Sequence, residues 1–385
     1  MNILDQNERP LNGLTVLDFS QFLSGPYCSL KLADLGAKVI KVERPQVGDL
    51  CRYLYLSDTE IDGDNSLFHA INRNKESITA DLRNPEDKER MYELLKSADV
   101  MIQNFRPGVI ERLGFGYDEI KKINPRIIYG SISGYGEEGP WKDLPGQDLL
   151  AQARSGLLWL SGNKQDAPMP MGLAAADMMA GNSLAQGILA ALVGRGIHGR
   201  GALVETSLLE AMIDFQFEVL TTYLNDGERL PQRSEVNGAH AYLGAPYGVY
   251  ETSDGYLALA MTPSLEKLCV LLGIDELSGF YNDKQALMTQ RDVIKSVLAK
   301  RLKTGTTKDW LAVLQPADIW CSEVLDWAEM RASDAYKVMD FEQQISRNAT
   351  VKLNTVRSPI RINRATLKSG VAAPVLGQDN KKYST

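Results

Sequence analysis

The feature that most limits the fold of this chain is the alternation of short apolar segments with helical segments in its first part. Helical stretches such as residues 24–37 and 84–98 separate segments that have the length and apolarity of buried strands. The expected strands are residues 14–20, 38–45, 77–82, 99–105 and 126–133. Strands separated by helices form right-handed crossovers, so the pattern predicts an α/β fold with a mostly parallel, Rossmann-like sheet and flanking helices.

Basic and amide side chains stand at the ends of several of these expected strands. Arg44 follows the second strand, Arg83 follows the third, and Asn104, Phe105 and Arg106 come at the end of the fourth. Ligands of parallel sheets bind at the carboxyl ends of the strands, where arginines can pair with phosphate groups through charged hydrogen bonds. This edge of the sheet is therefore the expected ligand-binding edge.

The rest of the chain predicts a second, smaller domain. Residues 225–238 are polar and contain Pro and Gly, as is typical of a connection between domains. A hairpin over residues 247–261 and several helical segments after it indicate a small α+β domain. We expect a large α/β domain over residues 1–224, a small domain with its linker over 225–325, and a return segment, 326–385, that completes the large domain and ends loosely.

Composition and residue spacing exclude several classes of function. The formal net charge of −7 argues against a nucleic-acid-binding surface, and no apolar run approaches the length of a membrane span. The four cysteines and three histidines are scattered, without the spacing of a metal site or of a histidine-based triad. We expect a reduced, cytoplasmic enzyme without a secretory signal, a nucleic-acid or membrane partner, or a metal ion.

The segment GYGEEG, residues 134–139, matches the G-x-G-x-x-G pattern of dinucleotide-binding loops and follows an expected strand. Pro140 and Trp141 come directly after it, where such a loop needs an apolar helix that packs on the sheet. The match is therefore weak. A dinucleotide-dependent oxidoreductase stays an alternative of another class.

One carboxylate, Asp177, interrupts the small and apolar residues of LAAADMMAGNSLAQGILAALV, residues 173–193. An aspartate at the start of a helix is a favoured N-cap, because its oxygens accept hydrogen bonds from free backbone N–H groups. The same N–H groups favour the charged carboxylate, and Gly181 is expected to leave open space beside it. Capping and catalysis are both compatible with this position.

Several stretches together resemble the class III CoA-transferase family, which includes formyl-CoA and carnitine CoA-transferases and 2-methylacyl-CoA racemases. Among them are GLTVLDFSQFLSGPYCSLKLADLGAKVIKVERPQVGD, DVMIQNFRPGVIERLGFGYDEIKKINPRIIYGSISGYGEEGPW, GQDLLAQARSGL and GRGALVETSLLEAM. The resemblance covers almost the whole chain in order. It implies an interlocked homodimer of ring-shaped subunits, with coenzyme A and acyl-CoA as substrates and no permanently bound cofactor.

By this resemblance Asp177 is the catalytic nucleophile. In the family, this carboxylate attacks an acyl-CoA thioester to give a mixed anhydride and CoA thiolate. The thiolate then forms an enzyme-bound thioester, which a carboxylic acid takes over. A carboxylate that is already ionised near neutral pH needs no general base for such an attack. Asp148 matches an acidic position that approaches the nucleophile, and it is equally well the N-cap of the helix that follows it.

The resemblance also places the coenzyme A contacts at the expected strand ends. Leu23 and Ser24 are expected near the pantetheine and the thioester, and Arg112 is expected to pair with phosphate. The full expected set is Leu23, Ser24, Arg44, Ala80, Asp81, Leu82, Arg83, Asn104, Phe105, Arg106 and Arg112.

One departure from the family pattern concerns the reaction type. In the racemases, the residue before the position of Asp148 is a histidine that exchanges the α-proton of the substrate. Here that residue is Gln147, which cannot act as a general base. We therefore expect the transferase branch, with transfer of CoA to a small, for example dicarboxylic, organic acid. A racemase or epimerase of the same family is the nearest alternative, and a non-catalytic CoA-binding protein is another.

A second departure concerns the acceptor. Residues 239–244, AHAYLG, stand where the formyl-CoA:oxalate enzymes have a run of glycines that covers the active site. His240 and Tyr242 are therefore expected to line the acceptor pocket, although an ordinary linker explains them equally well.

Overall fold

The computed structural model describes residues 3–53, 59–262, 264–283 and 285–384. These residues form two compact units, each assembled from segments that are distant in the chain. The first unit contains the residues up to Gln152, Ala174–Phe215 and the residues from Met339, and the second contains Ala153–Leu173 and Gln216–Val338.

The predicted domain boundaries differ from this division. Residues 153–173, expected in the large domain, belong to the second unit, and the return to the first unit begins at Met339. The first difference has a physical cause, since the Arg233 guanidinium donates to the carbonyl oxygens of Ser161 and Asp166 at 2.6 and 2.7 Å. Residues 153–173 therefore fold with the segment that the sequence indicated as a linker.

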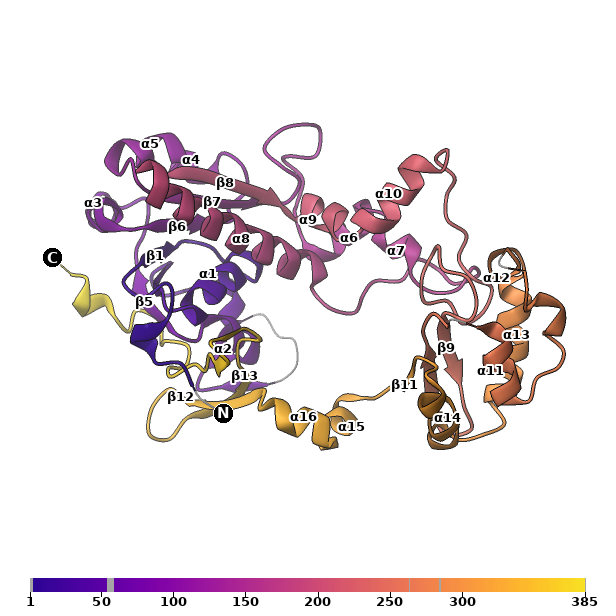
Figure 1. The fold of residues 1–385 in the computed structure, drawn as a ribbon. Coiled ribbons are helices and arrows are strands. Elements are labelled where there is room, and N and C mark those ends of the chain that lie inside the picture. The colour runs from indigo at the N-terminus through magenta and orange to yellow at the C-terminus, as the bar shows by residue number, and fades with distance from the viewer. Residues whose placement is uncertain (1–2, 54–58, 263, 284, 385) are drawn as a thin grey trace. The chain divides into compact units, whose positions relative to one another are not determined.

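The first unit is built on a six-stranded sheet in which every neighbouring pair of strands is parallel. The strand order is β5-β2-β1-β6-β7-β8, so β5 and β8 form the two edges (Figure 1). The strands are β1 (Thr15–Asp18), β2 (Lys38–Glu43), β5 (Lys75–Thr79), β6 (Val100–Gln103), β7 (Ile128–Ser133) and β8 (Ala202–Ser207). The five strands expected in the first part of the chain are all present, and the parallel sheet with flanking helices is confirmed.

Helices cover both faces of this sheet. On one face, α3 (Pro85–Ser97) and α5 (Tyr117–Ile123) contribute Met91, Leu95 and Ile120 to a core that they share with apolar side chains of the strands. On the other face lie α1 (Ser24–Asp34) and α8 (Ala175–His198), which pack against each other. Gly130 of β7 keeps this face open for α8, since a Cβ there would lie 3.0 Å from the side chain of Ile188.

The face of the sheet beneath α1 carries buried charges beside apolar side chains such as Val16 and Val39. Asp18 of β1 pairs with Lys75 of β5 at 3.2 Å, and Lys41 of β2 pairs with Asp49 at 2.8 Å. Buried charges require such partners. Asp49 also accepts a hydrogen bond of 3.0 Å from the backbone N–H of Phe22, so the network holds the loop between β1 and α1.

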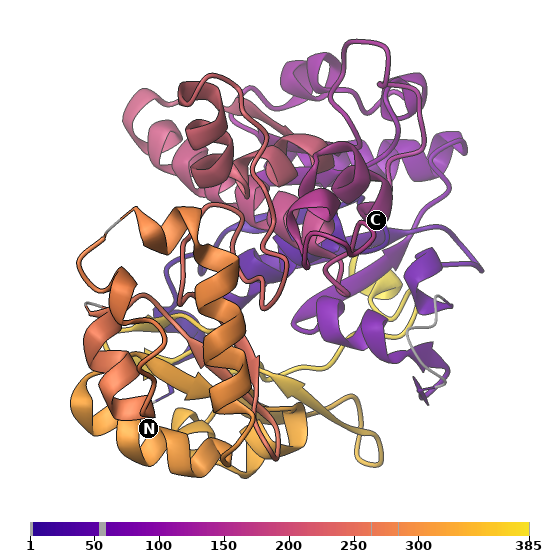
Figure 2. The ribbon, with the colours of Figure 1, turned by 90° about the vertical axis from the view of Figure 1, so that its right-hand side faces the viewer.

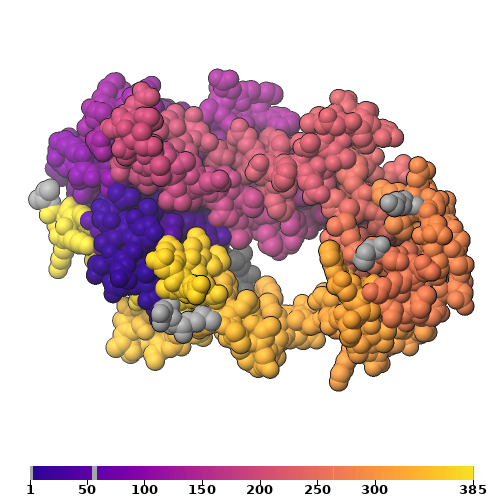
Figure 3. All heavy atoms as spheres, in the orientation of Figure 1, coloured from indigo at the N-terminus to yellow at the C-terminus, as the bar shows by residue number. Residues whose placement is uncertain are grey.

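The C-terminal residues lie along β5, at one edge of the sheet. The backbone N–H of Ser77 donates to the Asp379 carboxylate, and that of Thr79 donates to the Asn380 side chain, both at 2.8 Å. Figure 3 shows this segment, in yellow, beside N-terminal residues in indigo. The expectation that the chain ends loosely is wrong, because these hydrogen bonds cover a strand edge whose N–H groups would otherwise be free. The returning segment also contains β12 (Glu342–Ser346), β13 (Lys352–Val356), β14 (Arg361–Ile362) and β15 (Ala365–Thr366).

The second unit has its own sheet and its own core. Its antiparallel sheet contains β9 (Gly248–Glu251), β10 (Tyr256–Leu259) and β11 (Cys321–Glu323). A core of leucine and isoleucine side chains joins this sheet to α11 (Leu265–Leu272), α13 (Arg291–Leu302) and α14 (Thr307–Leu314), which are orange in Figure 2. The unit is thus α+β, and its hairpin turns between β9 and β10 as expected.

The long helix expected over residues 208–224 is two helices, α9 (Leu208–Asp214) in the first unit and α10 (Phe217–Asn225) in the second. The backbone of Gln216, with φ −102° and ψ 12°, leaves the helical conformation between them. The remaining helices are α2 (Ser66–Asn72), α4 (Val109–Arg112), α6 (Asp148–Arg154), α7 (Leu157–Leu160), α12 (Ala286–Thr289), α15 (Trp327–Ala332) and α16 (Asp334–Met339).

Candidate active site

Asp177 is the third residue of α8, and it does not cap that helix. The N-cap residue is Ala174, whose side chain makes no capping hydrogen bond. Asp148, the first residue of α6, supplies the missing acceptor: its Oδ1 accepts from the backbone N–H groups of Ala176 and Asp177 at 2.6 and 3.2 Å. Two predictions from the sequence are thereby corrected. Asp177 does not cap α8, and Asp148 caps α8 instead of α6, the helix that it begins.

The environment of Asp177 holds its carboxyl group partly protonated near neutral pH. Burial raises the pKa of Asp177 to about 7, and the negative charge of Asp148 adds to the increase. A hydrogen bond from the Ser24 hydroxyl acts in the opposite direction and lowers the pKa. The expectation that the group is already ionised near neutral pH is wrong, since desolvation outweighs the favourable helix terminus. Above pH 7 the ionised carboxylate is a nucleophile that needs no general base.

Gly181 does not leave open space beside Asp177. A Cβ at this position would lie 2.6 Å from the carbonyl oxygen of Ser24 and 3.1 Å from the ring of Tyr27. Glycine is needed here because α8 and the start of α1 approach each other closely. This close approach brings the Ser24 hydroxyl to the Asp177 carboxylate.

The loop between β1 and α1 is held in place by Asn104, which follows β6. The backbone N–H of Gln21 donates to Asn104 Oδ1 at 2.8 Å, and Asn104 Nδ2 donates to the Gln21 carbonyl at 2.7 Å. Nδ2 also donates to Ser24 Oγ at 3.3 Å. Leu23, next to Ser24, packs on an apolar cluster that includes Phe68. The structure thus brings three of the expected residues, Leu23, Ser24 and Asn104, to the nucleophile end of the site.

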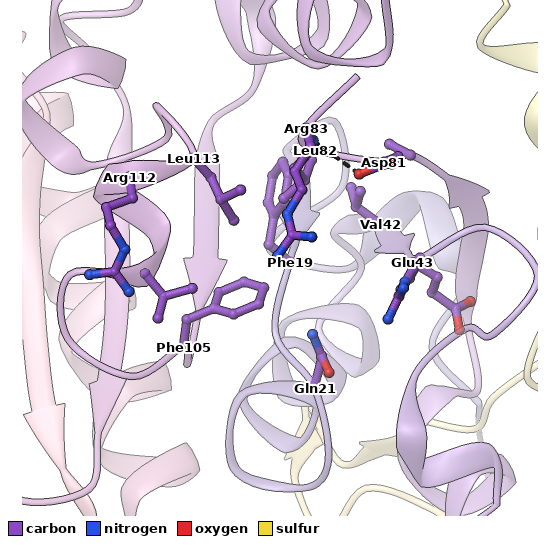
Figure 4. Close-up of a pocket in the computed structure, with 13 residues that line it drawn as sticks. Phe19, Gln21, Val42, Glu43, Asp81, Leu82, Arg83, Phe105, Arg112 and Leu113 are labelled. Carbon is purple, nitrogen blue, oxygen red and sulfur yellow. Dashed lines mark hydrogen bonds between the residues drawn. The ribbon is translucent and has the colours of Figure 1, made fainter. Parts of the chain in front are cut away.

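A pocket of about 640 Å³ opens at the carboxyl ends of β1, β2 and β6 (Figure 4). Its volume is within the range of small-molecule sites. Seven of the residues expected to contact coenzyme A line it, and these are Arg44, Ala80, Asp81, Leu82, Arg83, Phe105 and Arg112. In Figure 4, Arg112 and Phe105 lie on one side of the pocket, and Asp81, Val42 and Glu43 lie on the other. Arg44, Arg83 and Arg112 are exposed, so their guanidinium groups are accessible to anions.

Arg106 is exposed and does not line this pocket, so its contact with coenzyme A stays a prediction. The backbone turns away from β6 at Phe105, whose N–H donates to Gln103 Oε1 at 2.8 Å. Sequence reasoning missed Phe19, Gln21, Val42, Glu43, Val109 and Leu113, which also line the pocket. The first four are at strand ends, so the rule that selected Arg44 could have found them.

His240 and Tyr242 belong to the second unit, so their place at an acceptor pocket stays a prediction. The Nδ1 of His240 accepts from the backbone N–H of Tyr242 at 3.2 Å, and its Nε2 lies 3.7 Å from the carboxylate of Glu218. Since Nδ1 is an acceptor, the neutral ring carries its proton on Nε2.

The dinucleotide alternative finds no support in the geometry of GYGEEG. Residues 134–147, all of which the structure describes, contain turns and bends and no helix, so no helix N-terminus follows the glycines. Gly134 instead packs on Gly146, whose Cα would lie 2.6 Å from a Cβ at position 134. The loop ends at the exposed Gln147, directly before Asp148.

Within the part of the chain that the structure describes, no group of three or more His, Cys, Asp or Glu side chains could hold a metal ion. Over the same residues, no helix is long and apolar enough to cross a membrane.

Comparison with known proteins identifies the family. The sequence pattern of CoA-transferase family III matches residues 11–380, nearly the whole chain. The chain belongs to CoA-transferase family III. An acetyl-CoA:oxalate CoA-transferase from Acetobacter aceti is 33% identical over 358 residues, which are 91% of this chain and 87% of that protein. A succinate–glutarate CoA-transferase from Agrobacterium fabrum is 30% identical over 386 residues, 98% of this chain and 96% of that protein.

The fold of this family member also matches solved structures. A CaiB/BaiF family protein from Brucella suis superposes with a TM-score of 0.84 and 31% identity, and the match covers 100% of both chains. The protein is therefore a class III CoA-transferase, for which CoA thioesters are substrates.

Proposed function

We propose that this protein moves CoA from an acyl-CoA donor to a small organic acid through covalent intermediates on Asp177. The observation that carries the proposal is the position of this carboxylate. It lies in the first turn of α8, flanked by the Ser24 hydroxyl and by Asp148, which occupies the free N–H groups of the helix. Once ionised, this half-buried carboxylate can attack a thioester without a general base.

The proposed reaction has four steps. The ionised Asp177 attacks the acyl-CoA carbonyl carbon and releases CoA thiolate, which leaves a mixed anhydride. The thiolate attacks the aspartyl carbonyl carbon, releases the donor acid and forms an aspartyl-CoA thioester. The acceptor carboxylate attacks the aspartyl carbonyl carbon of that thioester and releases CoA thiolate, which leaves a new mixed anhydride. The thiolate finally attacks the acceptor's carbonyl carbon in this anhydride, which frees the product acyl-CoA and the Asp177 carboxylate. Each step exchanges one activated acyl group for another.

The pocket beside β1, β2 and β6 supports a proposed site for the nucleotide end of coenzyme A. Arg44, Arg83 and Arg112 are exposed around it and suit phosphate groups, which arginine recognises through paired hydrogen bonds. Phe105 offers an aromatic ring in the same pocket, on which a purine ring could stack. Leu23, Ser24 and Asn104 are proposed to contact the thioester end.

A dicarboxylic acid is the proposed acceptor. Two relatives carry names that include oxalate, succinate and glutarate, all of which are dicarboxylates. Gln147, next to Asp148, cannot exchange an α-proton, which favours transfer over racemisation. His240, whose Nδ1 accepts from the Tyr242 N–H and so leaves Nε2 as the donor, is proposed to donate to the acceptor carboxylate, with Tyr242 beside it.

We also propose a cytoplasmic, interlocked homodimer. Val193 and Ile197, near the end of α8, are 66% and 71% exposed, and apolar side chains grouped in this way are typical of subunit contacts. All four cysteines are free, which suits a reducing compartment.

A trapping experiment tests the proposed reaction. The protein is incubated with acetyl-CoA and with succinyl-CoA, treated with hydroxylamine, and digested for mass spectrometry. A hydroxamate at Asp177 that is lost in Asp177→Asn supports transfer, and an unmodified Asp177 with every donor contradicts it. Deuterium incorporation at the α-carbon without acyl exchange would instead indicate a racemase.

A further inference from the structure

Ser24 occupies an unusual position for a small polar residue. It is the first residue of α1 and only 4% exposed, and its side chain lies between the Asn104 amide and the Asp177 carboxylate. The close packing of α1 on α8 at Gly181 fixes this arrangement, because the backbone of Ser24 fills the space beside that glycine. Its hydroxyl therefore faces the proposed nucleophile, near enough to lower the pKa of Asp177, from a rigid element of the fold.

The Asn104 amide has one defined orientation. Its Oδ1 accepts from the Gln21 N–H at 2.8 Å and its Nδ2 donates to the Gln21 carbonyl at 2.7 Å, so a flipped amide would place two donors and two acceptors against each other. The second N–H of the amide points to Ser24 Oγ at 3.3 Å. Ser24 Oγ is thus an acceptor on the Asn104 side, and its own proton is available for Asp177.

This direction matters because the Ser24 hydroxyl favours the charged form of Asp177. Burial and the charge of Asp148 both raise the pKa of Asp177, and only the hydrogen bond from Ser24 lowers it. A donor that stabilises negative charge on an aspartyl oxygen stabilises it equally when that charge develops during a reaction.

We propose that Ser24 is a catalytic residue whose hydroxyl, oriented by Asn104, stabilises the oxyanion that forms on Asp177 when its acylated carbonyl carbon is attacked. The proposal rests on the proposed function of Asp177 as nucleophile. Asn104 acts through Ser24 and is a positioning residue.

The step is balanced without a proton donor or an external reagent. When CoA thiolate attacks the anhydride, a C–S bond forms and the carbonyl π pair moves onto the aspartyl oxygen that faces Ser24. The pair returns to restore the double bond as the C–O bond to the donor acid breaks, and the donor leaves as a carboxylate. The acceptor carboxylate later attacks the same carbon, and the thiolate leaves. Ser24 keeps its proton and donates one hydrogen bond throughout.

The test uses isotope exchange, so that one acid serves as both donor and acceptor. Wild-type protein is assayed with acetyl-CoA plus labelled acetate and with succinyl-CoA plus labelled succinate, and hydroxylamine adducts at Asp177 are measured in parallel. Ser24→Ala is expected to lower the exchange rate at saturating acyl-CoA about a hundredfold, as loss of a preorganised oxyanion donor does. The KM for acyl-CoA should change little, and Ser24→Thr should restore most of the rate, because it keeps the hydroxyl.

A matched control is Ser358→Ala, which removes another buried serine hydroxyl, one that accepts from Ile360 N–H. It should exchange at the wild-type rate. In Ser24→Ala the pH midpoint for adduct formation should also rise above that of the wild type, which a packing defect alone would not produce.

The outcomes separate this inference from the proposed function. If wild-type protein forms no adduct at Asp177 and shows no exchange, the proposed function fails and this inference fails with it. If the wild type forms the adduct and Ser24→Ala exchanges at full rate, only the role of Ser24 is overturned. Equal losses in Ser24→Ala and Ser24→Thr with a raised KM would also overturn it.

Discussion

The ionised carboxylate of Asp177 should lower the folding stability of the protein. Asp177→Asn is therefore expected to stabilise the protein while it abolishes CoA transfer. Burial and Asp148 raise the pKa of Asp177 from 3.8 to about 7, so the native state binds this proton more tightly than the unfolded chain does. Ionisation of Asp177 therefore destabilises the native state. The resulting loss of folding stability is complete above pH 7, becomes smaller as the pH falls below 7, and disappears below about pH 4.

The magnitude follows from the size of the shift. A change from 3.8 to about 7 is roughly three pKa units, and at about 1.4 kcal/mol per unit it corresponds to about 4 kcal/mol. Partial access of solvent to Asp177 reduces the expected gain of Asp177→Asn at pH 8 to about 2 kcal/mol. About half of this gain should be lost between pH 8 and pH 5.

Urea unfolding followed by circular dichroism at pH 8 and pH 5 measures both quantities. Asp143→Asn serves as the control, because it removes the same charge from an exposed position in the same unit and should leave the midpoint unchanged. The reasoning is refuted if Asp177→Asn is no more stable than the wild type at pH 8, or if its advantage is the same at both pH values.

Three further outcomes follow from the site. Asp148→Asn removes the like charge but keeps an acceptor for the N–H groups of α8, so the pH midpoint for hydroxylamine trapping at Asp177 should fall; an unchanged midpoint would contradict the pairing of these carboxylates. Gly181→Ala should destabilise the protein and lower the exchange rate, because its Cβ would lie 2.6 Å from the backbone carbonyl oxygen of Ser24. Gly194→Ala is the control in the same helix, since a Cβ there has nothing within 4 Å. Thermal unfolding should show Gly194→Ala as neutral or stabilised by about 0.5–1 kcal/mol. Arg83→Ala should raise the KM for acyl-CoA with little change in kcat and weaken the salt dependence of KM, and an unchanged KM would remove Arg83 from the proposed phosphate contacts.

The sheet and its ligand-binding edge could be predicted because they depend on local periodicity. Arg44 and Arg83 each follow a strand that the sequence indicates by itself, and parallel strands bring their carboxyl ends to one edge whatever the rest of the chain does. The same logic would have added Gln21, which follows β1.

The partners of Asp177 could not be predicted in this way. Asp148 caps a helix 29 positions further along the chain, and no local pattern links a capping residue to a helix at that distance. The sequence predicted free space beside Gly181, but in the structure α1 packs there and the Ser24 backbone fills that space. The pKa of Asp177 depends on its burial in this packing and on the charge of Asp148, and the sequence shows neither. The pKa expected from the sequence was therefore too low.

The cover over the edge strand β5 has a consequence for the order in which the protein can fold during synthesis. β5 is made early, yet the residues that bind its free N–H groups, Asp379 and Asn380, are separated from Ser77 by more than 300 positions. The ribosome produces every residue of the second unit within that interval. We therefore expect that a first unit folded before synthesis ends would leave this sheet edge unprotected while the second unit emerges, which is the interval in which a chaperone that shields strand edges could act.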